Sequence, residues 1–194
     1  MSSFFTIASI SKGEYKEKGS KFLAFAHPVQ NENEVREIVK SYKKEYYDAR
    51  HHCYAFIIGK DKGHFRAADD GEPSNSAGMP ILGQLRSKEV TNTLVVVVRY
   101  FGGTKLGVPG LVHAYKTAAE DALKNAFIVK EYVTFSLKLY FEYASMNDIM
   151  RIIKEHQFTI VSQELETRCI MVVKVKEEEY QLATSKFKNW LEKE

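Results

Sequence analysis

The sequence is poor in cysteine and has no long apolar run. Only Cys53 and Cys169 are present, far apart in a chain of 194 residues, so a disulfide-held secreted domain is not indicated. No stretch approaches the length of a membrane span. The first residues lack the basic start, apolar core and cleavage site of a signal peptide. We therefore expect a cytoplasmic protein with free, buried thiols and no membrane contact.

The chain also lacks the standard phosphate-binding motifs, internal repeats and low-complexity segments. A P-loop needs a glycine, four residues and then Gly-Lys-Ser/Thr, and the dinucleotide fingerprint needs G-x-G-x-x-G. Neither spacing is met by the glycines that follow the main apolar run, Gly102, Gly103, Gly107 and Gly110. With 44% hydrophobic and 27% charged residues, the composition is that of an ordinary globular protein.

The net charge of +3 is unevenly spread. Residues 132–194 contain 9 Lys/Arg and 10 Asp/Glu, which gives −1, whereas the rest of the chain carries 19 cations and 15 anions, which gives +4. This weak basic bias permits contact with phosphate or nucleic acid on one patch without requiring it.

The first part of the chain predicts two strands and a helix. The strands are expected at 4–11 and 20–29, and the helix over 31–47, where Asn31 can cap it with Glu34 in the reciprocal position. A basic turn is expected between the strands. A solvated turn is the plainer interpretation of its lysines and a binding patch is the other. These are Lys12, Lys16, Lys18 and Lys21.

Two adjacent histidines, His51 and His52, open a strand predicted over 51–59. Side chains alternate along a strand, so the two rings point to opposite faces and cannot chelate one metal without other ligands. Structural histidines bonded to carbonyl groups are the simpler interpretation. A general base or metal ligand is the alternative.

An acidic loop, residues 69–74, places the carboxylates of Asp69, Asp70 and Glu72 close together. Such oxygens suit a hard cation, although an EF-hand needs a longer ligand series. Paired carboxylates can also divide acid and base roles. The third interpretation is structural: Asp69 or Asp70 bonds backbone N–H groups or pairs with Arg99 or Arg66, which we favour over a metal. Because a buried arginine needs a carboxylate, we expect one of the three loop carboxylates to lie against Arg99. A short helix follows, with Ser76 as its candidate cap.

A glycine turn joins the most apolar strand to a long helix. The strand is predicted over 94–100 and, being β-branched throughout, is expected to be buried on both faces. The helix is predicted over 109–126. A strand, a glycine loop and a helix start together favour anion binding, whereas turn-forming glycines are an equally good interpretation. The candidate phosphate-binding residues are Arg99, Gly102, Gly103, Lys105, Gly107 and His113.

The last third of the chain predicts a second domain. Strict alternation begins near residue 132, then a helix is expected at 145–156, strands at 158–167 and 169–175, and a final helical stripe to 191. The order β-α-β-β-α is that of a ferredoxin-like plait without its last strand. We expect an α+β protein with domains at 1–131 and 132–194.

The motifs resemble those of the Impact family, in its bacterial YigZ-type branch. The resemblance covers the N-terminal two-thirds closely, and the remainder agrees in length and pattern. It is carried by KGSKF at 18–22, DARHHCYA at 48–55, the DDGEP loop at 69–73, GMPIL at 78–82, and RYFGG with LG at 99–107.

The resemblance implies particular folds and partners. The N-terminal domain is expected to be similar to the second domain of ribosomal protein S5. The C-terminal domain is expected to be similar to the last domain of elongation factor G. Eukaryotic relatives act in translational control by competing for the activator of a starvation-responsive initiation-factor kinase. They carry a different additional domain, which we do not find in this sequence, so that partnership is not transferred to this chain. RNA or the ribosome are the implied partners, by fold kinship alone.

Two functions are consistent with the sequence. The first is a noncatalytic protein that binds a nucleic-acid or nucleotide phosphate, connected with translation or its regulation, without cofactor or metal. The alternative is a phosphate-handling, metal-dependent hydrolase. Its candidate catalytic residues are Asp69, Asp70, Glu72, His51 and His52. We prefer the binding protein.

Overall fold

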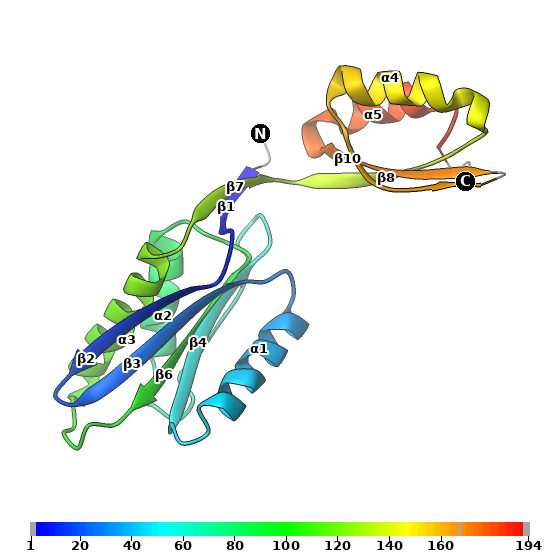
Figure 1. Cartoon of the computed structure of the whole chain (residues 1–194). Coiled ribbons are helices and arrows are strands. Elements are labelled where there is room, and N and C mark those ends of the chain that lie inside the picture. Colours follow the sequence, from blue (N-terminus) through cyan, green and yellow to red (C-terminus); the bar gives the residue numbers. More distant parts are fainter. Residues whose placement is uncertain (1–2, 167, 192–194) are drawn as a thin grey trace. The chain divides into compact units, whose positions relative to one another are not determined.

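The computed structural model describes residues 3–166 and 168–191, which fall into two compact units (Figure 1). One unit is Phe4–Glu131, and the other groups Ser3 with the residues from Tyr132 onward. That these units are separate domains, with bounds 1–131 and 132–194, and that either folds alone, stay predictions. In the described part of the chain, no helix is long and apolar enough to cross a membrane.

The N-terminal unit is built on a five-stranded antiparallel sheet, in which β6 is the central strand. Across the sheet the strands are β2 (Ser11–Glu17), β3 (Ser20–Pro28), β6 (Thr93–Tyr100), β4 (His51–Ile58) and β5 (His64–Ala68). The chain ends of this unit pair in a separate two-stranded sheet, β1 (Ser3–Ile7) with β7 (Ile128–Tyr132).

Strand β6 is buried on both faces, as its apolar sequence predicts. Val95 and Val97 belong to the core on one face, together with residues of α2 and α3, whereas Val96 and Val98 belong to the core on the α1 face. Helices therefore cover both sides of the sheet (Figure 1). They are α1 (Glu32–Glu45), α2 (Gly78–Ser87) and α3 (Gly107–Lys124).

The sequence-based prediction was wrong at β2, and it did not include β5 or β7. The predicted strand at 4–11 is broken after Ile7, and the predicted basic turn is itself strand β2, with the real turn at Lys18-Gly19. Strand β2 lies at the sheet edge with one wet face, so its polar side chains resemble those of a turn. A Cβ at Gly13 would lie 2.2 Å from the backbone nitrogen of Ala122, so glycine allows α3 to pack there.

Two of the helix starts differ in how they are capped. The predicted cap of α1 is confirmed, because the Asn31 side chain accepts the N–H of Glu34 at 3.1 Å. Helix α3 begins at Gly107, two residues before the predicted start, so Pro109 lies in its first turn, where its missing N–H costs nothing. No side chain caps α3.

The C-terminal unit has the predicted order β-α-β-β-α. Its antiparallel sheet runs β8-β10-β9, with both long helices on one side (Figure 1). Leu139, Met171 and Val173 face those helices and form the core with Ile149 and Phe187. The elements are β8 (Thr134–Phe141), η1 (Tyr143–Ser145), α4 (Met146–His156), β9 (Thr159–Leu165), β10 (Cys169–Lys176), η2 (Glu177–Glu179) and α5 (Tyr180–Phe187).

Candidate functional site

The acidic loop meets the end of β6 through Glu72. A Glu72 carboxylate oxygen lies 2.6 Å from Nη1 of Arg99 and accepts the Tyr115 hydroxyl at 2.8 Å. The exposed fractions of the side chains are 4% for Glu72 and 8% for Arg99. The sequence predicted that one of the loop's three carboxylates lies against Arg99, and the contact with Glu72 confirms this. Glu72 takes this place because Asp69 and Asp70 are bonded elsewhere.

Asp69 caps helix α2. Its carboxylate accepts three backbone N–H groups, one in the preceding loop and two at the start of that helix, where the dipole favours negative charge. Ser76, the predicted cap, instead donates its hydroxyl to the carbonyl of Pro73 at 2.6 Å. The three N–H groups belong to Asn75, Ala77 and Gly78, at 2.8, 3.0 and 2.8 Å.

Asp70 joins the loop to α1 and β4. Its carboxylate accepts the Lys43 ammonium at 2.6 Å and the backbone N–H of His52 at 2.7 Å. Burial alone would raise the pKa of Asp70, but these two donors outweigh it, so the pKa lies below the ordinary value. Asp70 therefore remains ionised and paired near neutral pH.

Both histidines are bonded to carbonyl groups, as the simpler interpretation predicted. His51 donates from Nδ1 to the carbonyl of Asp70 at 2.9 Å, and His52 from Nε2 to that of Tyr46 at 3.1 Å. Burial lowers the pKa of His52. Nε2 of His51 is 4.0 Å from Glu72. Among the described residues, no His, Cys, Asp and Glu side chains are grouped so that they could hold a metal.

Tyr115 ties α3 to this network, a role that sequence reasoning missed. The sequence predicted the helix over 109–126 that carries Tyr115, but not the bond from its hydroxyl to Glu72. The Cys53 thiol lies 3.3 Å from that hydroxyl and 2.9 Å from the carbonyl of Asp69. Burial raises the pKa of both Cys53 and Tyr115, so both stay protonated near neutral pH. Cys53 is consequently not a thiolate nucleophile.

Gly102 packs the glycine turn against the β2–β3 hairpin. A Cβ at Gly102 would lie 1.9 Å from the carbonyl carbon of Gly19, and its N–H donates to the Ser20 hydroxyl at 3.1 Å. Gly103 and Gly107 have φ of +88° and +70°, values that glycine adopts most easily. The glycines are therefore needed for the backbone conformation and close packing of the turn, whether or not it binds a ligand.

The exposed part of the turn is positive. Lys105 is exposed, and α3 begins two residues later without a side-chain cap, so its first N–H groups and the dipole's partial positive charge are available there. Arg99 lies behind this region, with Cζ 5.8 Å from the Phe101 ring and with a buried Nε that has no hydrogen-bond partner in the described residues. His113 is farther along α3, edge-on to the ring of Tyr15.

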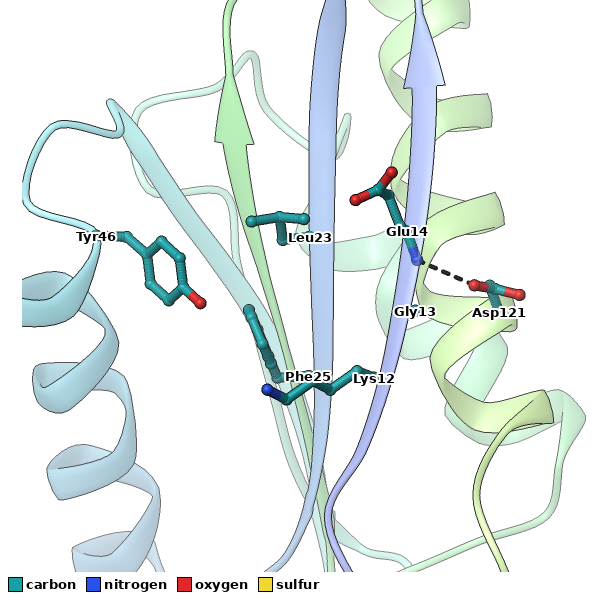
Figure 2. A pocket seen from close by; sticks show the side chains of 7 residues that line it. All are labelled: Lys12, Gly13, Glu14, Leu23, Phe25, Tyr46 and Asp121. Carbon is teal, nitrogen blue, oxygen red and sulfur yellow. Dashed lines mark hydrogen bonds between the residues drawn. The ribbon is translucent and has the colours of Figure 1, made fainter.

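A separate hollow of about 360 Å³ lies on the α1 face of the sheet, beside edge strand β2 (Figure 2). Two of the residues that line the hollow are in contact, since the Lys12 amine lies 5.6 Å from the centre of the Phe25 ring. The charged side chains of the hollow are of both signs and include no residue of the acidic loop or glycine turn. The lining residues are Lys12, Gly13, Glu14, Leu23, Phe25, Tyr46 and Asp121.

The α+β fold carries an acidic loop that is linked to the end of β6, beside the glycine turn, through Glu72 and Arg99. This arrangement defines a protein of the Impact type. Residues 18–123 match the Impact N-terminal domain, and the chain belongs to the Impact family. The match includes the β2–β3 turn, the acidic loop, the glycine turn and α3. The motifs that first suggested the family are therefore the segments that form this network.

The similarity to bacterial relatives extends past this domain. The chain is 31% identical to IMPACT family member YvyE of Bacillus subtilis over 97% of its own length and 85% of the relative. It is 31% identical to IMPACT family member YigZ of Escherichia coli over 80% of its length and 78% of the relative. A crystal structure described as a hypothetical protein matches with a TM-score of 0.74 at 28% identity, covering 97% of this chain and 93% of that one.

Proposed function

We propose that this chain is a noncatalytic protein that binds a nucleic-acid or nucleotide phosphate at the glycine turn and acts in connection with translation or its regulation. One observation carries the proposal: the exposed Lys105 stands at the uncapped start of the 18-residue helix α3. Open backbone N–H groups, a helix dipole and a mobile ammonium together suit a phosphate.

The roles of the candidate residues in this proposal follow from their exposure. Gly103, Lys105 and Gly107 contact the phosphate. Arg99 and Gly102 hold the turn from behind, since Arg99 is 7% exposed and the N–H of Gly102 is already bonded to Ser20. His113 lies on the flank of α3, outside the first turn.

The acidic loop supports binding over hydrolysis. Asp69 is bonded to three backbone N–H groups, Asp70 to Lys43 and His52, and Glu72 to Arg99 and Tyr115. Carboxylates used in this way hold the fold together and have little freedom to bind a metal or move a proton. No observation favours the hydrolase.

The link to translation rests on the family and on fold kinship. We propose that the N-terminal unit is related to the second domain of ribosomal protein S5. We propose also that the C-terminal unit is a ferredoxin-like plait related to the last domain of elongation factor G. Its strand order supports this, as does the antiparallel bridge of Leu191 to Leu139, at the position of the plait's fourth strand. RNA or the ribosome in the cytoplasm are the proposed partners.

The test is a titration of the full chain with RNA, single-stranded DNA and nucleotides at two salt concentrations. Wild type is compared with Lys105→Gln and with Lys116→Gln, a charge-matched control farther along α3. Binding should weaken as salt rises, and Lys105→Gln alone should weaken it, by several-fold. Salt-independent binding, or equal effects of the two variants, would place the phosphate elsewhere.

A further inference from the structure

The C-terminal sheet presents one open face. In strands β8 and β10, odd-numbered residues such as Leu139 and Met171 are buried against the helices. Even-numbered residues point the other way, since side chains alternate along a strand. Among the described residues of this unit, no helix covers that second face (Figure 1). We call it the open sheet face.

The open sheet face gathers cations. Antiparallel pairing sets Lys138 beside Val172, Tyr140 beside Ile170, and Lys174 beside Ser136. The exposed Lys176 and Arg168 extend this group at the two ends of β10. Among the described residues, Glu164 shares the face opposite Ile170, and the exposed Glu142 and Glu166 directly follow β8 and β9 at the Arg168 end. Although residues 132–194 have a net charge of −1, the strand positions of this face carry Lys138, Lys174 and Lys176 against Glu164, so the excess of cations lies along β8 and β10.

An aromatic ring lies among these cations. Tyr140 is partly exposed, and its ring has the Lys138 amine at 5.1 Å and the Arg168 guanidinium carbon at 5.6 Å. At the other end, the Lys176 amine lies 4.8 Å from the ring of Tyr132, which is 37% exposed. Ile170 and Val172, both partly exposed, form an apolar strip between the two ends.

We propose that the open sheet face binds single-stranded RNA. Lysines along a sheet can neutralise successive phosphates, while Tyr140 and Tyr132 offer rings on which unpaired bases stack. An acidic peptide would use the cations but not the rings. This surface is in a different unit from the glycine turn, so the proposal does not rest on phosphate binding there.

The test is fluorescence anisotropy of the full chain with a short labelled oligouridylate across a range of salt concentrations. The double variant Arg168→Gln with Lys174→Gln removes two charges from the face. Lys154→Gln with Lys186→Gln is the matched control, because these lysines lie on α4 and α5 and are exposed. We expect the face variant, and not the control, to bind about tenfold more weakly. Its salt slope should fall by about 0.7 for each phosphate that the variant no longer neutralises.

A third variant separates stacking from charge. Tyr140→Leu keeps apolar bulk on the sheet and should weaken binding by about tenfold with the salt slope unchanged. Circular dichroism checks that each variant is folded. Lys105→Gln, measured in parallel, reports on the glycine turn and leaves this face intact.

Several outcomes would overturn the proposal. One is equal affinity of the face variant and its helix-side control. Others are a Tyr140→Leu variant that binds as the wild type does, and competition by polyglutamate as strong as that by oligouridylate. Loss of self-association in sedimentation velocity, with RNA binding unchanged, would instead make the face an interface between two copies of the chain.

Discussion

Glu72 and Arg99 form a 2.6 Å ion pair although 27 residues separate them in the sequence. Because Tyr115 donates to the same carboxylate oxygen, the pair connects the acidic loop, the end of β6 and helix α3. Both side chains are removed from water, so each depends on the other for its hydrogen bonds. The glycine turn begins at Phe101, two residues after Arg99 in the sequence, so the ion pair lies next to it.

Breaking this pair from one side should be costly. Glu72→Gln leaves the Arg99 guanidinium buried without a counter-charge, and we expect a loss of about 3–5 kcal/mol in the free energy of unfolding. Arg99→Met should cost a similar amount. The double variant should cost less than the sum of the two, as a double-mutant cycle by urea unfolding would show. Additive effects, or single losses near zero, would mean that the pair is not coupled.

Asp69 should matter for stability through helix α2. Asp69→Ala removes the acceptor for three N–H groups, and we expect a loss of about 2 kcal/mol, at the upper end for helix caps. Ser76→Ala is the control, because its hydroxyl makes one bond to a carbonyl, and it should cost about 1 kcal/mol. Urea unfolding of both variants measures the difference. A larger loss for Ser76→Ala would contradict the assignment of Asp69 as the side chain that stabilises the start of α2.

The pairing of Asp70 should make stability depend on acid pH. Its folded pKa is lowered by Lys43 and the His52 N–H, so its stabilising contribution is full above the unfolded value, about pH 4. The contribution is lost as the pH falls through the folded pKa. Asp70→Asn should therefore be less stable than wild type at neutral pH, with the gap closing below about pH 4. Urea unfolding at a series of pH values checks this, and a gap independent of pH would contradict it.

The two adjacent glycines of the turn should differ in their response to alanine. A Cβ at Gly102 meets the backbone of the β2–β3 turn, and such overpacking costs about 1–3 kcal/mol and displaces the loop. Gly103 has open space around its Cβ position but a φ of +88°, so alanine there should cost about 1 kcal/mol of backbone strain. Thermal unfolding compares the two. Equal losses of stability at the two positions would show that the backbone at Gly19 can move away from a Cβ at Gly102 at little cost in free energy.

The sequence predicted the elements well where hydrophobic pattern decides them. The run at 94–98 belongs to β6 and is buried on both faces, and the alternation after residue 132 marks β8. It failed at β2, because an edge strand with a wet face has the composition of a turn. Only part of the site could be predicted from the sequence. The local residues indicate that the carboxylates of the acidic loop need hydrogen-bond or ion-pair partners, but not which partners they find. The choice of Glu72 for Arg99, and of Asp69 for α2, depends on contacts between distant segments.

The central claim is that a phosphate binds at the start of α3, and the most direct measurement is an amide NMR titration of the full chain. Inorganic phosphate is added first and oligouridylate second, with Lys105→Gln as the comparison. We predict that the amides of residues 103–108 shift earliest with both ligands and that the Lys105 variant needs several-fold more ligand for the same shifts. Shifts confined to other residues, with 103–108 unmoved at saturation, would contradict the account.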